Sequence, residues 1–337
     1  MNGKKKPDKT EKVVRSSPSA KKNRHKKDVT DPNTPMARFL LLPSLVGVLV
    51  FYVVPSFIVA YYSIVDNPIS KKFVGIENFK TLFSAWAFTQ AAKNTLLLSF
   101  TAVPAAVILS LILAKVLNSK IPGKSMFRTF FLSPMMVPVA SVVLIWQVMF
   151  HHTGSVNALL TWFQGTHLVG FIDHVILSLG GTVNHTDWSA VDWLKSDKAM
   201  VVVVLLFQWK NMGYNMILFL AALNSIPKDL VEVAELEGAS PLWRMIHIKF
   251  RYLSPTFLFV TIMSLINSFK LFREVYLLTG DYPHEKLYLL QHFMNNTFRT
   301  LDYQKLSSAA IVMAAFMVVI IGVLFTVESI FGKDVEE

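Results

Sequence analysis

The chain has 337 residues, of which 53% are hydrophobic and 16% are charged, whereas about a quarter of the residues in an ordinary soluble domain are charged. The absence of cysteine excludes a disulfide framework, thiol catalysis and cysteine-ligated zinc. The formal net charge of +11 is unevenly distributed, because the first 38 residues contain 12 lysines or arginines and only four acidic residues.

Residues 1–38 form a basic segment with too few apolar side chains to fold by itself, so we expect it to be disordered. One interpretation is binding to nucleic acid or to lipid headgroups. The other is a cytoplasmic arm that sets the orientation of the chain, since positive residues are retained on the cytoplasmic side of a membrane. A long apolar run follows directly at Phe39. This favours the arm, and we expect no nucleic-acid partner.

Six apolar runs follow, each close to the length of about 20 residues that a helix needs to cross a bilayer. They cover about residues 39–65, 94–114, 129–150, 199–223, 252–269 and 306–327. Within them only Lys210 is charged. We therefore predict an all-α membrane protein with six transmembrane helices in residues 39–330, followed by a short tail at 331–337.

The charges of the loops indicate the orientation. With the N-terminal segment inside, the loop after the second run is also inside, and both termini are cytoplasmic. That loop carries no acidic residue and four basic ones, namely Lys115, Lys120, Lys124 and Arg128.

The long loop 151–198 then faces outward and is rich in histidine. Its histidines are His151, His152, His167, His174 and His185. Their spacings match no usual pattern of metal ligands, so we interpret them as scattered loop residues and expect no metal site. The apolar stretch 168–179 is expected to lie on the membrane surface or to pack as an extra helix.

The loop 225–255, after the fourth run, has the pattern of two short helices joined by glycine. Pro227 suits the first turn of a helix, and Asp229 and Glu232 stand near its positive end. Gly238 follows where a left-handed residue usually ends a helix. Pro241 can open a second helix over about residues 242–249.

On the first of these helices, Leu230, Val233 and Ala234 fall on one side because they are spaced three and four apart. The glutamates point elsewhere. Such an element, with an apolar knob and an acidic flank, suits insertion into a basic-rimmed cleft of a partner. The alternative is an ordinary amphipathic connector that lies on the bilayer.

The order of residues in this loop resembles the "EAA" loop of binding-protein-dependent ABC importer permeases. The matching positions are Glu232, Val233, Ala234, Gly238, Ile248 and Pro255. Other stretches resemble the carbohydrate-uptake branch of these permeases, which includes maltose, glycerol-phosphate and arabinose-type permeases. The stretches that carry this resemblance are residues 73–79, 94–95, 123 with 127–129, 193–194, 209 with 213, 222–227 and 277–280. The resemblance covers about residues 39–330. Arg251, where proline is common, and Asp281, where a Gly-Gly-Pro sequence is usual, depart from it.

The resemblance implies a type I ABC importer permease fold, in which the helix–Gly–helix loop is a cytoplasmic coupling loop. It implies that the chain lies in a bacterial plasma membrane. It also implies three kinds of partner: a second permease subunit, a cytoplasmic ATPase dimer and an extracytoplasmic solute-binding protein. The residues that would couple to the ATPase are Glu232, Ala234, Glu237, Gly238 and Ala239. No GxxxxGK[ST] motif occurs, so we expect ATP and Mg²⁺ on the partner ATPase and no cofactor on this transport subunit.

A charged residue inside a membrane span costs about 2.5–3.5 kcal/mol on insertion scales and tends to face a cavity or a partner. Lys210 is such a residue. Together with neighbouring amide and aromatic side chains it is a candidate for the solute pathway, because sugars have apolar faces and polar rims. The candidates are Lys210, Asn211, Tyr214, Asn215, Asn267 and Phe272. The alternative is interhelical packing.

Three other functions stay open at this point. A secondary transporter or channel would need intramembrane acids for ion coupling and two related halves, but the six runs contain no acidic residue. An intramembrane enzyme would need a nucleophile with a partner base, and none is evident. An ABC importer of another solute is the closest alternative, although the branch-specific stretches favour a sugar.

Overall fold

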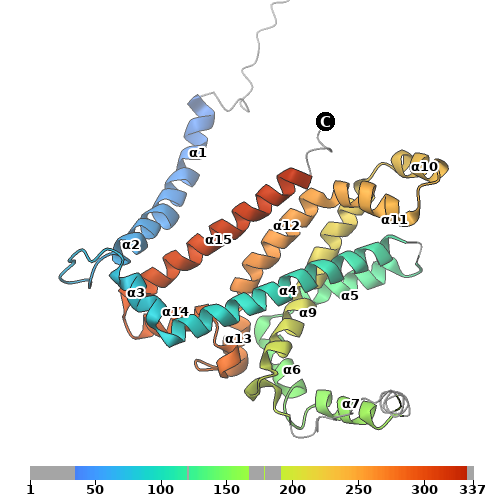
Figure 1. Ribbon diagram of the computed structural model, residues 1–337. Coiled ribbons are helices and arrows are strands. Elements are labelled where there is room, and N and C mark those ends of the chain that lie inside the picture. The colour runs from blue at the N-terminus through green and yellow to red at the C-terminus, as the bar shows by residue number, and fades with distance from the viewer. Residues whose placement is uncertain (1–34, 120, 167–177, 179–190, 332–337) are drawn as a thin grey trace, which may run out of the picture. The chain divides into compact units, whose positions relative to one another are not determined.

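The computed structural model describes residues 35–119, 121–166, 178 and 191–331 (Figure 1). Several predictions fall outside these residues: the N-terminal segment up to residue 34, His167, His174, His185, nearly all of the stretch 168–179, and the tail 332–337. The chain divides into two compact units, residues 1–57 and 58–337. Each is described by itself.

The first unit contains the start of the first apolar helix. α1 (Pro35–Val48) leads through a π-helical turn, η1 (Leu49–Val53), into α2 (Val54–Tyr62). The run Leu41–Tyr62 is long and apolar enough to cross a membrane. Pro43 lies inside α1. Membrane helices tolerate such prolines because local adjustments of the helix satisfy the freed backbone groups.

The second unit is built from helices. In chain order the first are α3 (Glu77–Ser84), α4 (Trp86–Asn118), α5 (Lys124–Met136), α6 (Val139–Met149), α7 (Ser155–Gln164) and the 3₁₀ turn η3 (Trp193–Lys195). After them come α9 (Ala199–Ser225), α10 (Lys228–Leu236), α11 (Pro241–Arg244), the π-helical η4 (Met245–Lys249), α12 (Phe250–Phe269), α13 (Phe272–Thr279), η5 (Glu285–Leu287), α14 (Leu290–Arg299) and α15 (Tyr303–Phe331). In the described residues the only β pairing is an isolated bridge between Val65 and Phe73, which confirms the all-α class.

The helix α9 lies at the centre of this unit. α4 packs along it, α5 and α12 flank it, and α15 packs against α12 and α3 (Figure 1). The core contains large, fully buried side chains of α9, among them Phe207, Met216 and Phe219. Lipid tails are as apolar as these side chains, so close packing rather than escape from water holds such helices together.

Polar side chains add hydrogen bonds between the spans. Gln208 of α9 donates its Nε2 proton to the carbonyl oxygen of Ala102 on α4, at 2.8 Å. The hydroxyl of Ser110 donates to the carbonyl of Met212 at 3.1 Å, and Ser99 and Ser268 are hydrogen-bonded at 2.9 Å. These contacts fix the rotation of α4 against α9 and α12.

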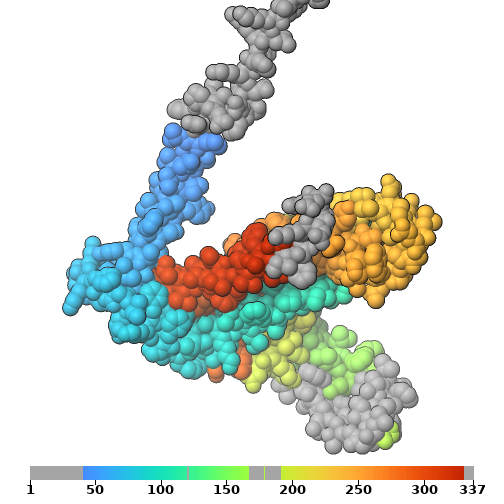
Figure 2. Space-filling model, turned by 45° about the horizontal axis from the view of Figure 1, so that its top comes forward, coloured from blue at the N-terminus to red at the C-terminus, as the bar shows by residue number. Residues whose placement is uncertain are grey.

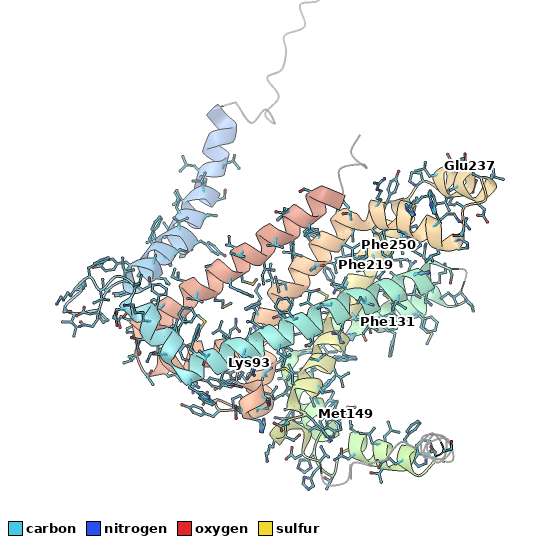
Figure 3. All side chains as sticks on the ribbon, in the orientation of Figure 1. Lys93, Phe131, Met149, Phe219, Glu237 and Phe250 are labelled. Carbon is cyan, nitrogen blue, oxygen red and sulfur yellow. The ribbon has the colours of Figure 1, made fainter. Side chains whose placement is uncertain are left out.

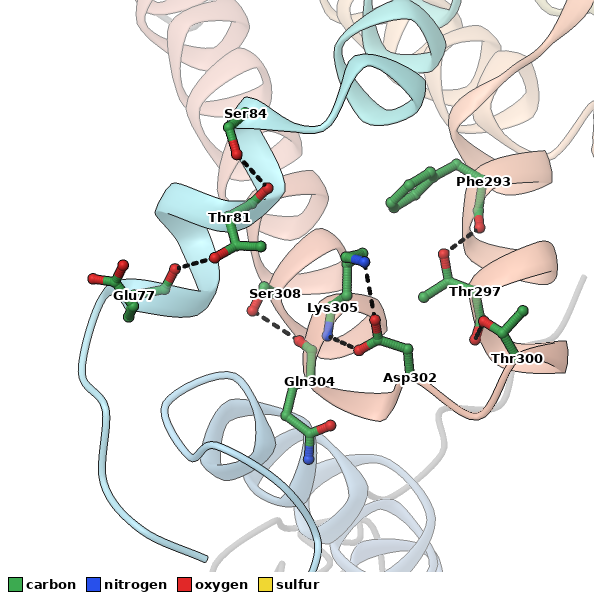
Figure 4. A network of polar contacts seen from close by, with 10 residues as sticks. All are labelled: Glu77, Thr81, Ser84, Phe293, Thr297, Thr300, Asp302, Gln304, Lys305 and Ser308. Carbon is green, nitrogen blue, oxygen red and sulfur yellow. Dashed lines mark hydrogen bonds and ion pairs between the residues drawn. The ribbon is translucent and has the colours of Figure 1, made fainter.

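The last span begins at a side-chain cap. Asp302 accepts a hydrogen bond from the backbone N–H of Lys305 at 3.0 Å and pairs with its Nζ at the same distance (Figure 4). An acidic residue at this position satisfies a free backbone donor and complements the positive end of the helix. Ser308, one turn further on, is buried and donates to the carbonyl of Gln304.

The predicted third span over 129–150 is not one unbroken helix. The chain forms α5 and α6 instead, which meet at a bend of 98°. Val137 at the break is extended (φ −78°, ψ 132°) because the following residue, Pro138, disfavours the helical conformation before it. Among the described residues, five helices are long and apolar enough to cross a membrane, or six if the bent pair counts as one span.

The second short helix, expected over about 242–249, is present as α11 and η4, and it continues without a break into α12. α11, η4, α12 and α13 follow each other closely enough to form one 39-residue apolar helical stretch, Pro241–Thr279. The π-helical turn η4 lies between α11 and α12 and keeps the helix continuous. The fifth span is therefore longer at both ends than the predicted 252–269.

Gly213 allows the backbones of α9 and α5 to lie close together. A Cβ atom at this position would overlap the carbonyl oxygen of Phe131 on α5 and would lie 2.5 Å from its carbonyl carbon. Both neighbours are backbone atoms, so they cannot rotate away. Glycine at this position is thus required for α9 to contact α5.

We predict that Gly213→Ala destabilises the protein by about 1–3 kcal/mol, the usual cost of overfilling a packed interior. The measurement is the thermal unfolding midpoint of the detergent-solubilised protein. Gly322→Ala is the matched control, because Gly322 is also helical and a Cβ there meets nothing within 4 Å. Equal midpoints for both variants would contradict this account of Gly213.

Candidate functional site

The first candidate site is an arm formed by α10 and α11, which projects from the end of the helical unit opposite to α7 (Figure 1). In the space-filling view it forms a protruding lobe, coloured yellow to orange (Figure 2). Glu237 lies near its tip (Figure 3). The arm connects directly to two spans, because α9 ends at Ser225 just before it and α12 follows it.

A glycine turn shapes the arm. The N–H of Ala239 donates to the carbonyl of Ala234 at 2.9 Å, and the N–H of Gly238 donates to that of Glu235 at 3.1 Å. This pair of bonds is the Schellman arrangement, which needs a left-handed residue. Gly238 has φ +83° and supplies it. The predicted left-handed end of this helix is therefore confirmed.

Contacts within the arm tie its two helices together. The Ser240 hydroxyl caps α11 by accepting a hydrogen bond from the N–H of Trp243 at 3.2 Å. Arg244 of α11 pairs with Glu235 of α10 at 2.5 Å. The ring of Trp243 stacks on that of His247 at 4.5 Å between centroids. The two helices thus form one structural element rather than a loose loop.

A groove of about 620 Å³ lies between the two helices of the arm. Its wall includes Leu230 and Val233, about half exposed, and Ala234, which is buried. Four of the five predicted coupling residues line it, namely Ala234, Glu237, Gly238 and Ala239. The fifth, Glu232, is exposed on α10 outside the groove. The arm therefore presents apolar surface and an exposed carboxylate side by side.

The second candidate site is a polar cavity of about 230 Å³ between α9 and the α12–α13 junction. It is lined by Met135, Lys210, Asn211, Tyr214, Asn267, Lys270, Leu271 and Glu274. The structure thus brings together four of the six predicted pathway residues, which come from two spans that are far apart in the sequence. Lys210 lies near the middle of the 27-residue helix α9, so the cavity is at membrane depth.

Polar contacts organise the cavity. Lys210 forms an ion pair with Glu274, whose side chain is only 7% exposed. Asn267 donates its Nδ2 proton to Oδ1 of Asn211 at 3.0 Å, and Asn211 donates to the carbonyl of Phe207 at 2.9 Å. These bonds link α9 to both α12 and α13.

Sequence reasoning missed Glu274 and Lys270. The fifth run was ended at 269, so neither residue was counted within the membrane, whereas the helical stretch continues to Thr279. The six runs as predicted contain no acidic residue, but the longer helical stretch Pro241–Thr279 includes Glu274. One signal was available. A charge at mid-span, such as Lys210, calls for a counter-charge, and Glu274 stands only a few residues after the end of the fifth apolar run.

The remaining two candidates lie apart from the cavity. Asn215 is buried and donates to the hydroxyl of Ser264 at 2.9 Å, so it joins α9 to α12. Phe272 packs edge-on against His292 of α14, with 4.9 Å between ring centroids. Burial lowers the pKa of His292 to about 4, so this imidazole is neutral at physiological pH and serves as a packing partner for Phe272.

Metal ligands do not gather at either site. His151 and His152 are adjacent, with 4.0 Å between ring centroids. Within the ranges that the structure describes, no group of three or more histidine or acidic side chains could hold a metal ion.

We predict that Glu274→Gln destabilises the protein, because Lys210 would keep its charge without a partner. Loss of one member of a buried pair costs about 3–5 kcal/mol, and the effect here should be smaller because the Lys210 side chain is 27% exposed. The double variant Lys210→Met/Glu274→Gln should recover part of the loss. A double-mutant cycle of unfolding midpoints measures the coupling. Additive effects of the two single variants would argue against the pair.

Comparison with known proteins gives a consistent family. The family model described as "Binding-protein-dependent transport system inner membrane component" matches residues 102–336. The sn-glycerol-3-phosphate transport system permease protein UgpA of Yersinia pestis is 30% identical over 288 residues, covering 84% of this chain and 89% of that protein.

Two further relatives carry sugar-transport names. The multiple sugar-binding transport system permease protein MsmF of Streptococcus mutans is 28% identical, with 88% of this chain and 95% of that protein covered. The arabinooligosaccharides transport system permease protein AraP of Bacillus subtilis is 30% identical, with 79% of each covered.

The fold is also similar to that of a solved bacterial ABC transporter involved in the import of the acidic polysaccharide alginate. The TM-score is 0.68 at 21% identity, and the match covers 87% of this chain and 94% of that chain. At this identity the likeness establishes the type I permease fold.

Proposed function

The chain belongs to the family of binding-protein-dependent transport system inner membrane components, and from this premise we propose that it is one permease subunit of an ATP-driven carbohydrate importer. It forms half of the solute pathway and pairs with a second permease subunit. A cytoplasmic ATPase dimer hydrolyses ATP, with its Mg²⁺, and an extracytoplasmic binding protein delivers the solute. The N- and C-termini lie in the cytoplasm.

The observation that carries the proposal is the projecting arm. It is a compact element with an apolar groove. It connects the end of α9 to the start of α12. A projection of this kind suits docking into a cleft of a partner better than lying on a bilayer, because its apolar side chains come from α10, α11 and η4 and line a groove between them. In this role Leu230 and Val233 would enter the cleft, and Glu232 would meet a basic group at its rim.

The polar cavity supports the pathway part of the proposal. Its amides, lysines and phenol come from two spans and enclose a space at membrane depth. Groups of this kind form hydrogen bonds with solute hydroxyls. Asn215 and Phe272, which lie apart from the cavity, are assigned to packing between helices.

The carbohydrate assignment rests on the relatives. The names of MsmF and AraP refer to sugars and arabinooligosaccharides, and that of UgpA to a phosphorylated polyol. All three solutes carry several hydroxyl groups, in agreement with a pathway lined by amides. An importer for another class of solute is the alternative.

The first test is purification of the tagged subunit in mild detergent, followed by identification of the proteins that accompany it. We expect a second permease and an ATPase in constant stoichiometry, and ATP-dependent solute uptake after reconstitution in liposomes. A chain that purifies alone and moves solute without ATP would instead be a self-sufficient transporter.

The arm provides a second prediction. Glu232→Lys should reduce ATP-dependent uptake by about tenfold or more, because it reverses a charge at the proposed contact with the ATPase. Gly238→Pro should do the same, since proline cannot adopt φ +83°. Both variants should still insert into the membrane.

The control for charge reversal is Glu77→Lys, which changes an exposed glutamate on α3, away from the arm. It should leave uptake unchanged. Normal uptake by both arm variants would remove the coupling role from this loop.

A further inference from the structure

The charges in the polar cavity do not balance. Its wall contains two lysines, Lys210 and Lys270, and one acid, Glu274. The charge of Glu274 is neutralised by its ion pair with Lys210. Within the part of the chain that the structure describes, Lys270 forms no ion pair. The cavity therefore has one surplus positive charge.

Lys270 is placed to meet a solute. It stands at the end of α12, where its backbone N–H closes the last turn by donating to Ile266 at 3.1 Å. Its side chain is exposed and lines the cavity, three residues after Asn267 on the same helix. The Asn267–Asn211 amide pair lies beside it. One cation and several neutral hydrogen-bonding groups thus face the same space.

A cation at membrane depth requires water or an opposite charge. The buried carboxylate of Glu274 is already paired with Lys210, so the exposed Lys270 ammonium is available to an anionic group from outside this chain. An ammonium group is a compact point charge without the fixed fork of arginine, so it accepts carboxylates and phosphates in several orientations.

We propose that this cavity binds the acidic group, a carboxylate or a phosphate, of an anionic carbohydrate, and that Lys270 is the residue that receives it. This inference rests on the proposed function, because it names the solute class of the same pathway. The Lys210–Glu274 pair shapes the wall and keeps its own charges satisfied. The hydroxyl groups of the solute bind to Asn211, Asn267 and Tyr214.

The test uses the complete importer, purified with its partner subunits and binding protein and reconstituted in liposomes. ATP-dependent uptake is measured for three labelled probes: digalacturonate, glycerol 3-phosphate and the neutral disaccharide maltose. We expect uptake of at least one anionic probe to exceed that of maltose. The two anionic probes distinguish a carboxylate from a phosphate.

Three variants locate the effect. Lys270→Met should lower anionic uptake by about tenfold or more, because it removes the charge and keeps the length of the side chain. Lys270→Arg should retain most of the uptake. Lys93→Met is the matched control, since Lys93 is an exposed lysine on α4 outside the cavity (Figure 3), and it should behave like the unmodified protein.

The outcomes separate this inference from the function on which it rests. Uptake of maltose but of neither anionic probe would overturn the anionic solute and leave the carbohydrate importer standing. Solute uptake that does not need ATP would contradict the importer itself. If Lys270→Met abolishes copurification of the second permease, the counter-charge belongs to that subunit, and the inference is wrong.

Discussion

The packing of α9 against four other helices is the constraint on which the rest of the larger unit depends. Inside a bilayer the hydrophobic effect does not drive helices together, so contacts at short range must do so. α9 makes a different contact with each neighbour. Gly213 lets α5 approach its backbone, Gln208 bonds to α4, Asn215 bonds to α12, and Lys210 pairs with Glu274 of α13. These contacts leave little freedom for α9 to rotate or slide.

The polar cavity is a consequence of this packing. Lys210 and Asn211 would face lipid, at high cost, if α9 were rotated by half a turn. In the observed orientation they meet the junction of α12 and α13, where the helix changes direction and leaves room for polar side chains. One set of interhelical contacts therefore both stabilises the unit and creates the polar cavity.

The arm and the cavity are linked along the chain by the fifth span. The stretch Pro241–Thr279 includes α11 of the arm at one end and Glu274 of the cavity wall near the other. α9 provides a second connection, since it contains Lys210 and ends next to α10. The proposed docking surface and the cavity are therefore built from the same two spans.

Local features of the arm were predictable from the sequence, and cavity residues were predictable only in part. Gly238 was placed correctly because a helix end with a left-handed residue depends on neighbours within a few positions. Glu274 was missed because its burial depends on Lys210, which lies 64 positions earlier in the chain. The bend at Val137 was also missed, although Pro138 is a local signal, because an uninterrupted apolar run was read as one straight span.

The sequence by itself determined the all-α membrane class, the approximate positions of the apolar spans, and the helix–Gly–helix form of the loop 225–255. These properties follow from composition and from interactions between near neighbours, which the order of residues displays directly. Only the tertiary structure decided which polar residues share a cavity, that Asn215 and Phe272 lie outside it, and that Lys270 stands there without an acidic partner among the described residues. These properties depend on the rotation and bending of helices distant in the chain, and an apolar run contains no record of the direction in which each of its side chains will point.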